Sequence, residues 1–486
     1  MGELNGLVTD WLDEMTVREM MERMNAGELT SEELTVAYLQ NIAVKNASHF
    51  AILEVNPQAV QIAKMLDMER RQGLVRSPMH GIPVLLKDNM DTGDSMHTSC
   101  GSLALSHYYA ADDAFLVKKL RAAGAVILGK TNMTEWANFM SDRMRNGWSS
   151  RGGQVMNPYG PFDVGGSSSG AAVAVADNLT AVSIGTETSG SIINPSTQNS
   201  IVGIKPTVGA ISRTGIIPLS FTQDTPGPMA RTVEDALFAF EQMIGFDEKD
   251  PVSYGANKFK GIDWQSTLDV HALKGVKIGV ARKIFEREVS SEEMQLFDDA
   301  LKKIEALGGE IVDHIDLGTM EDDLGYDVLL HEFKSALNGY LERTAASNPI
   351  RTLKDIIQFN NDHAEETLKY GQAMLERSER TSGTLTDPSY IEALLRNRRL
   401  AGELALDRAF DTYGIQAIVF PKDHGCSFSS AVGYPAVAVP ASFTKEGEPF
   451  GITFCGKAYD EPKLIGYAYA FEQFTRGRKS PSMRNS

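Results

Sequence analysis

Short segments that are apolar at every position alternate with amphipathic helices in the first third of the chain. Residues 82–86 read Ile-Pro-Val-Leu-Leu and residues 125–128 read Ala-Val-Ile-Leu, so both faces of each predicted strand are suited to burial. Helical periodicity marks the segments around them: residues 30–42, 58–71 and 113–123. The first helix opens with a capping box from Thr30 to Glu33. Helices that alternate with fully apolar strands favour an α/β fold with a largely buried sheet.

The second half of the chain has a different pattern. Charged amphipathic helices dominate residues 290–307 and about 321–412, and their polarity predicts a more exposed helical layer. Three strands return at residues 417–420, 436–439 and 452–454, followed by a last helix at 463–474. Because strand-rich segments flank the helical part, we expect residues 1–486 to form one domain with a mainly helical section over about 285–412.

The charge balance limits the classes of partner. The chain has 47 Lys and Arg against 64 Asp and Glu, which gives a net charge of −17 at pH 7. This surplus of negative charge disfavours nucleic acid and anionic membranes, so we expect neither as a partner. The three cysteines, Cys100, Cys426 and Cys455, are too few and too dispersed for a disulfide framework. Since residues 1–10 show no signal-peptide pattern and no apolar run is long enough to cross a bilayer, the sequence predicts a cytoplasmic protein.

Serine and glycine are concentrated between residues 165 and 192, and this density indicates serine chemistry. The segment Gly-Ser-Ser-Ser-Gly at 166–170 fits the nucleophile elbow Gly-x-Ser-x-Gly, with Ser168 at its centre. That motif follows an apolar strand, whereas residues 157–163 read as a loop with two prolines. It also needs a histidine base, for which His424 is the late-chain candidate. A Ser-His-Asp site around Ser168 is therefore an alternative, but not the preferred one.

Two other ligand-binding patterns are incomplete. Residues 165–170 have the spacing of a phosphate-binding loop, but Ala171 and Ala172 follow where that loop needs a lysine and a hydroxyl residue. His331-Glu332 is not followed by the second histidine of a zinc-binding helix. The sequence therefore predicts no metal site and no cofactor.

A neutral lysine can replace histidine as the base that activates a serine. Lys87 directly follows the apolar residues 82–86 and therefore lies at the end of a predicted buried strand. Burial there would lower the pKa of its amine, as a general base requires. From this segment alone, Lys87 could equally point out to solvent, and both alternatives stay open.

Four segments occur in a fixed order along the chain: Gly81–Asp88, Gly165–Gly170, Gly185–Ile192 and Gly203–Thr207. In their order and spacing the chain resembles the amidase signature family. The resemblance is strongest from about residue 78 to 232, where Asp-Thr-Pro-Gly-Pro-Met-Ala-Arg at 224–231 continues it, and it is looser at 433–440 and 450–454. It implies a large mixed β-sheet surrounded by α-helices and an amide-hydrolysing activity without a cofactor.

The resemblance also implies a Ser-cisSer-Lys triad. Ser191 would be the nucleophile, Ser167 the serine preceded by a cis-like peptide bond, and Lys87 the base that takes the proton through Ser167. The glycine-rich turn can present unobstructed backbone N–H groups to an oxyanion. The N–H groups expected to do so belong to Thr188, Ser189, Gly190 and Ser191. On this assignment Ser191→Ala should abolish activity, whereas Ser168→Ala should leave most of it.

Departures from the family pattern bear on the substrate. Ile193 stands where many members have arginine, and Ser169 and Ser189 stand where glycine is frequent. The motifs look more similar to bacterial peptide amidases and general amidases than to the glutaminase subunit of the tRNA-dependent amidotransferase. We therefore expect hydrolysis of a small or peptide-like carboxamide through an acyl-enzyme, by a monomer or homodimer. The alternatives are a catalytically idle binding protein and that glutaminase subunit.

Overall fold

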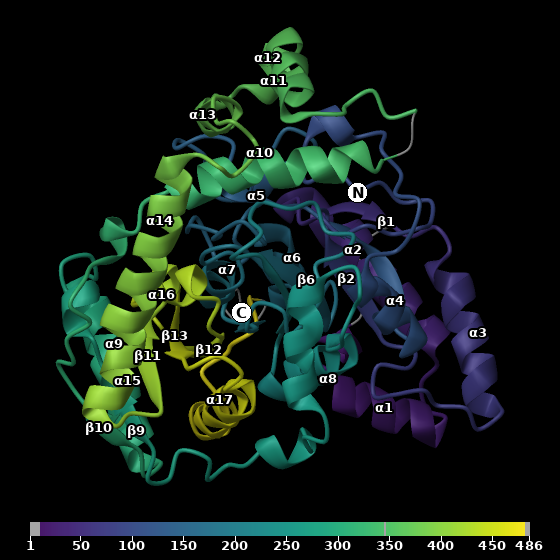
Figure 1. The fold of residues 1–486 in the computed structure, drawn as a ribbon. Helices are drawn as coiled ribbons and strands as arrows, with labels where there is room; N and C mark the ends of the chain where they lie inside the picture. Colours follow the sequence, from purple (N-terminus) through teal and green to yellow (C-terminus); the bar gives the residue numbers. More distant parts are fainter. Residues whose placement is uncertain (1–9, 345–346, 482–486) are drawn as a thin grey trace.

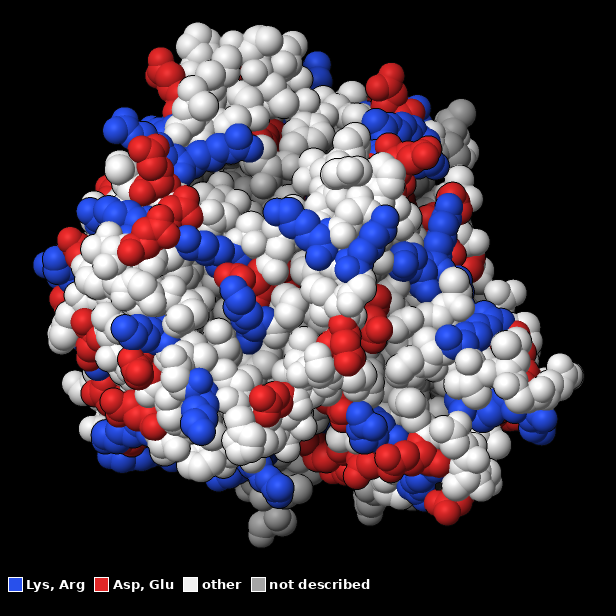
Figure 2. Space-filling model, turned by 60° about the horizontal axis from the view of Figure 1, so that its bottom comes forward, with Lys and Arg blue, Asp and Glu red and all other residues white. Residues whose placement is uncertain are grey.

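The fold of residues 10–344 and 347–481 is given by a computed structural model of the chain. Residues 1–9, on which the signal-peptide prediction largely rests, lie outside this range. None of the helices in the described part of the chain is long and apolar enough to span a bilayer. Positive and negative side chains are interspersed over the face drawn in Figure 2.

An eleven-stranded mixed sheet runs through the molecule in the order β1-β3-β2-β6-β8-β7-β12-β13-β11-β9-β10. Its strands are β1 (Ile52–Val55), β2 (Pro83–Lys87), β3 (Val126–Thr131), β6 (Val182–Glu187), β7 (Val202–Lys205), β8 (Thr225–Ala230), β9 (Lys277–Gly279), β10 (Glu310–Val312), β11 (Ala417–Pro421), β12 (Ala436–Phe443) and β13 (Pro449–Cys455). β2 lies parallel to β3 and β6, whereas β8 lies antiparallel to β6 and β7. A separate pair, β4 (Trp148–Ser149) and β5 (Gly153–Gln154), forms a small antiparallel ribbon.

Helices surround this sheet (Figure 1). They are α1 (Val17–Ala26), α2 (Ser31–His49), α3 (Ala59–Arg71), α4 (Phe115–Ala122), α5 (Glu135–Asn138), α6 (Ser169–Ala176), α7 (Ile193–Gln198), α8 (Val233–Met243), α9 (Ser291–Ala306), α10 (Asp327–Glu342), α11 (Leu353–Asp362), α12 (Ala364–Thr367), α13 (Ala373–Glu379), α14 (Pro388–Arg398), α15 (Asp407–Tyr413), α16 (Cys426–Ala431) and α17 (Glu461–Thr475). The predicted α/β class, with a large mixed sheet surrounded by helices, is confirmed.

Several local predictions are also confirmed. Thr30 caps α2 through a capping box with Glu33, because its hydroxyl accepts the Glu33 N–H while the Glu33 carboxylate accepts the Thr30 N–H. Every residue of α6 is buried, which agrees with its Ala/Val-rich composition. All three cysteines are unpaired and buried.

Two strands differ from the sequence prediction. The predicted strand at residues 125–128 is longer in the structure, because β3 continues through Gly129 to Thr131. Only glycine fits at position 129, since β1 crosses so closely that a Cβ there would lie 2.3 Å from the Glu54 carbonyl oxygen. β8 was not predicted, since Pro226 and Pro228 are unusual in a central strand. N–H groups two residues apart point to the same edge of a strand, so these prolines remove donors from one edge only. β6 pairs with all six β8 residues along the other edge.

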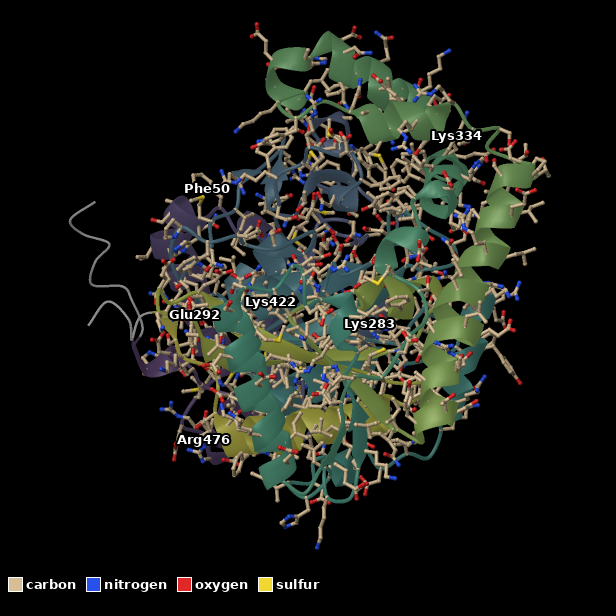
Figure 3. The ribbon with its side chains drawn as sticks, turned by 90° about the vertical axis from the view of Figure 1, so that its left-hand side faces the viewer. Phe50, Lys283, Glu292, Lys334, Lys422 and Arg476 are labelled. Carbon is tan, nitrogen blue, oxygen red and sulfur yellow. The ribbon has the colours of Figure 1, made fainter. Side chains whose placement is uncertain are left out.

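The helical section comprises α10 to α15 and a π-helix at Arg399–Leu406. Its helices α10, α11 and α13 share a hydrophobic cluster with residues 100–140 and 217–219 of the N-terminal half. Figure 1 shows α10 to α13 at the top of the molecule and α14 and α15 along one side. Phe333 of α10 packs edge-on against Phe139, with 5.5 Å between ring centroids. Lys334, labelled in Figure 3, donates to the carbonyl oxygens of Glu379 and Thr381 at the end of α13. The Phe333 contact attaches the section to the residues that follow β3, and the Lys334 contacts join α10 to the end of α13.

Candidate active site

Lys87 is the last residue of β2, which lies between β3 and β6, and its side chain is fully buried. Its amine donates to the hydroxyls of Ser167 at 2.7 Å and Ser168 at 2.9 Å, and to the Thr186 carbonyl oxygen at 3.1 Å. Burial disfavours the ammonium form and lowers the pKa of Lys87 to about 7. Of the two alternatives for Lys87, the structure therefore has the interior one.

The serine segment lies beside the Lys87 amine, just before α6. The peptide bond between Gly166 and Ser167 is cis, as the resemblance implies. Gly166 is tightly enclosed, because a Cβ at this position would lie 2.6 Å from the Asn146 amide oxygen. The Ser167 carbonyl oxygen accepts the Thr134 N–H at 3.0 Å. These contacts fix the backbone that presents the Ser167 hydroxyl to Lys87.

Ser191 lies in the turn that joins β6 to α7, with only 5% of its surface exposed. Two hydrogen bonds connect the turn and the start of α7 to the serine segment: Ser168 N–H donates to the Ser191 carbonyl oxygen at 3.2 Å, and Gly166 N–H donates to the Asn194 amide oxygen at 2.9 Å. The Glu187 carboxylate accepts the Ile192 and Ile193 N–H groups at 2.8 and 3.0 Å and so closes the turn. Lys87, Ser167 and Ser191 are thus brought into one buried region.

The backbone N–H groups of residues 188–191 are free to bind a ligand. Within residues 10–344 and 347–481, no acceptor takes the N–H of Thr188, Ser189, Gly190 or Ser191. Gly190 has φ +77°, a left-handed conformation that glycine adopts without strain. Free, adjacent donors at a turn suit a developing oxyanion.

The loop at residues 219–224, for which the sequence indicated no role, makes hydrogen bonds to this turn. Thr188 donates its hydroxyl hydrogen to the Asp224 carboxylate at 2.6 Å, and the Gln223 side chain donates to the Thr188 carbonyl oxygen at 3.2 Å. Asp224 also accepts the N–H groups of Leu219 and Ser220 at 2.7 and 2.8 Å, and its burial raises the pKa of its carboxyl group. Asp224 begins the segment at residues 224–231 that continues the resemblance. The resemblance therefore marks its position but does not predict its contacts.

The helical section reaches the same loop through Glu332 of α10. The buried Glu332 carboxylate accepts the Thr222 N–H at 3.1 Å, the Tyr390 hydroxyl at 2.8 Å and the Ser220 hydroxyl. Sequence reasoning considered this residue only as part of an incomplete zinc motif. In the structure, Glu332 links the 219–224 loop to α10.

A cavity of about 280 Å³ opens in front of Ser191. Its inner wall includes Gly166, Thr188, Ser189 and Ser191. Its outer wall comes from the helical section and the segments next to it, and includes Leu324, Tyr326, Leu329 and Asn397. The helical section therefore forms part of the wall of the cavity in front of Ser191.

A family model described as Amidase matches residues 33–465. The chain belongs to the amidase family. Its structure is similar to that of native peptide amidase from Stenotrophomonas maltophilia, with 42% identity, a TM-score of 0.89, and coverage of 96% of this chain and 98% of that chain. A probable amidase of Arabidopsis thaliana is 38% identical over 97% of this chain and 92% of its own length. A glutamyl-tRNA(Gln) amidotransferase subunit of Thioalkalivibrio sulfidiphilus is 30% identical over 96% of this chain and 98% of its own length. The resemblance seen in the sequence is thus confirmed, and the protein is an amide-hydrolysing enzyme.

The histidines of the two alternative motifs, His424 and His331, each face a carboxylate. His424 faces Glu288, 3.7 Å from its carboxylate, and the Phe285 ring. His331 lies 3.1 Å from Asp387. No group of three or more His, Cys, Asp or Glu side chains in the described residues is arranged to hold a metal ion.

Ser168 has a larger role in the amidase than the sequence indicated. It occupies the position before α6, but its side chain makes no capping bond. Instead its hydroxyl accepts from Lys87, donates to the Thr186 carbonyl oxygen at 3.0 Å and accepts the Thr186 N–H at 3.2 Å.

We therefore revise the expected effect of Ser168→Ala. The substitution leaves the buried Thr186 N–H unsatisfied, which should cost about 1–3 kcal/mol of unfolding free energy. Loss of one Lys87 contact should lower kcat by about tenfold. The loss should be no larger than this because Ser167 still contacts the amine. Urea unfolding and steady-state kinetics on the same preparation measure both effects. A loss as large as that of Ser191→Ala would restore the Ser168 nucleophile alternative.

Proposed function

We propose that the amidase hydrolyses carboxamides through a triad of Ser191, Ser167 and Lys87. The observation that carries this proposal is the 2.7 Å contact between the buried Lys87 amine and the Ser167 hydroxyl. With its pKa near 7, about half of the amine is neutral at pH 7 and available as a base. The free N–H groups of residues 188–191 support the same reaction class.

The reaction begins when Ser191 Oγ attacks the amide carbonyl carbon. Its proton passes to Ser167 Oγ, while the Ser167 proton passes to the neutral Lys87 amine. Negative charge that develops on the carbonyl oxygen is stabilised by the N–H groups of Thr188, Ser189, Gly190 and Ser191, where one such donor is typically worth about 10²–10³ in rate. The C–N bond then breaks as the proton returns through Ser167 to the leaving nitrogen. Water hydrolyses the resulting ester of Ser191 by the same relay, which releases the acid and regenerates the enzyme.

We propose small or peptide-like carboxamides as the substrate class. The 42% identity to a peptide amidase exceeds the 30% identity to the amidotransferase subunit, and this difference supports hydrolysis without a partner protein. One eleven-stranded sheet with strands between residues 52 and 455 supports the proposal that residues 1–486 form one amidase domain. The net charge of −17 supports action on small molecules and not on nucleic acid or anionic membranes. We also propose that the enzyme is cytoplasmic and acts as a monomer or homodimer.

The purified chain alone, assayed for ammonia release with EDTA present, tests this function. We expect turnover of C-terminally amidated dipeptides and simple carboxamides by the wild type and not by Ser191→Ala. Turnover limited to glutamine, and only after an amidotransferase partner is added, would favour the glutaminase alternative. Tight binding of amides without any turnover would favour the idle binding protein.

A further inference from the structure

A second, larger cavity of about 700 Å³ lies beside the catalytic one. Three residues, Ala137, Thr188 and Leu219, line both cavities. A substrate whose carbonyl oxygen reaches the free N–H groups of residues 188–191 therefore lies against a wall of the second cavity. When the leaving group is ammonia, the long arm of the substrate is its acyl part. That arm is the part with the length to enter the second cavity.

The walls of the second cavity are largely apolar. Its aliphatic and aromatic lining includes Ile216, Pro218, Leu219, Phe221, Val252 and Ala336. Phe221 and Val252 are nearly half exposed, at 45% and 46%, so they form part of the rim. This lining suits an apolar segment of the acyl arm.

Three of the described charged side chains that line this cavity have partners within it, and two do not. Arg213 makes a two-point contact with Asp250, at 2.7 and 2.8 Å, and Asp224 accepts hydrogen bonds from Thr188 and two backbone N–H groups. The remaining charged lining residues are two cations, Lys249 and Arg343, both exposed at the rim. Neither forms an ion pair within 4.0 Å in the described part of the chain. Asp112 and Asp247 lie within electrostatic range of Lys249 but do not pair with its amine.

We propose that this second cavity binds the acyl arm of the substrate and that Lys249 and Arg343 select acyl groups that carry a carboxylate at their far end. The inference rests on the proposed amidase function and specifies its substrate: an amide with an apolar middle and an anionic end. The two cations act at the rim, where solvent screens them, so each contributes a modest factor. Together they should favour the anionic substrate about fivefold in kcat/KM, mainly through KM.

N-succinyl-phenylalaninamide and N-butanoyl-phenylalaninamide form a matched pair of probes. They share the reacting carboxamide and the apolar body, and differ only by a terminal carboxylate in place of a methyl group. We expect the wild type to prefer the succinyl compound about fivefold, and to lose most of this preference as NaCl is raised from 50 to 500 mM. In the variant Lys249→Met/Arg343→Met the ratio should fall to about one.

A control variant, Lys302→Met/Arg287→Met, removes the same charge from residues that line neither cavity. It should keep the wild-type ratio. The ratio of dissociation constants for the two probes, measured by calorimetry on Ser191→Ala protein, tests the inference without turnover. Absence of hydrolysis of both probes by the wild type would therefore count against the proposed function alone. Equal affinities for both probes, or a preference that persists in Lys249→Met/Arg343→Met, would overturn the carboxylate subsite.

Discussion

Ser191→Ala is expected to lower kcat for amide hydrolysis by about 10⁶-fold, the size of the loss seen when the nucleophile of a serine hydrolase is removed. The loss should be this large because alanine cannot form the acyl-enzyme, whereas the Lys87–Ser167 contact and the free N–H groups of the turn stay in place. Binding should change little, because the hydroxyl is a small part of the cavity wall. Ammonia release under saturating amide gives kcat, and mass spectrometry of quenched wild-type enzyme should detect an acyl adduct on Ser191.

Ser427→Ala is the matched control, since Ser427 lines the same cavity and lies outside the proposed triad. Its kcat should stay within about threefold of the wild-type value, as expected for a substitution that touches no reacting group. An acyl adduct on another residue, or substantial turnover by Ser191→Ala, would rule out Ser191 as the nucleophile.

The elements predicted best from sequence are those whose pattern is local. The capping box of α2 involves Thr30 and Glu33, three positions apart, and the burial of α6 follows from its own composition. β8 could not be predicted in this way, because its prolines are tolerated only through the pairing it makes with β6 and β7. Gly129 likewise looks like a strand end until β1, more than seventy residues earlier in the sequence, is placed against it.

The same distinction between local and long-range features applies to the candidate site. The resemblance predicted Lys87, Ser167 and Ser191, whose roles remain proposals, and the structure brings all three into one buried region. It did not predict Glu332, whose contacts with Thr222 and Tyr390 join segments 110 and 58 positions away. Nor did it predict the contact of Ser168 with Lys87, because adjacent serines in a glycine-rich segment look alike until the backbone fixes which hydroxyl points where.

The second large effect is expected at Lys87 and depends on pH. Because the neutral amine is the proposed base, kcat/KM should rise about tenfold per pH unit below its pKa and level off above it, with a midpoint near the folded pKa of about 7. Lys87→Met should remove this rising limb and lower kcat by several orders of magnitude. Lys87→Arg should fail almost as completely, because a guanidinium stays protonated and cannot accept the Ser167 proton. Near-normal turnover by Lys87→Arg, measured across pH 5.5–9.5, would show that positive charge and not a base is needed.

Near pH 6, Lys87→Met should raise the free energy of unfolding although it abolishes most of the activity. The pKa of Lys87 falls from 10.5 to about 7 on folding, so the unfolded chain binds more protons between these values. Burial of Lys87 therefore costs stability, roughly 4–5 kcal/mol below pH 7, and this cost diminishes as pH rises towards 10.5. Lys87→Met removes this cost. It also leaves the Ser167 and Ser168 hydroxyls without their lysine partner, which should destabilise the variant by about 1–3 kcal/mol. In urea unfolding the variant should thus gain on the wild type at pH 6, and the difference should shrink by roughly 3 kcal/mol by pH 9.5. A difference that does not depend on pH would mean that Lys87 keeps an ordinary pKa in the folded protein, and a neutral lysine could then not be the base near pH 7.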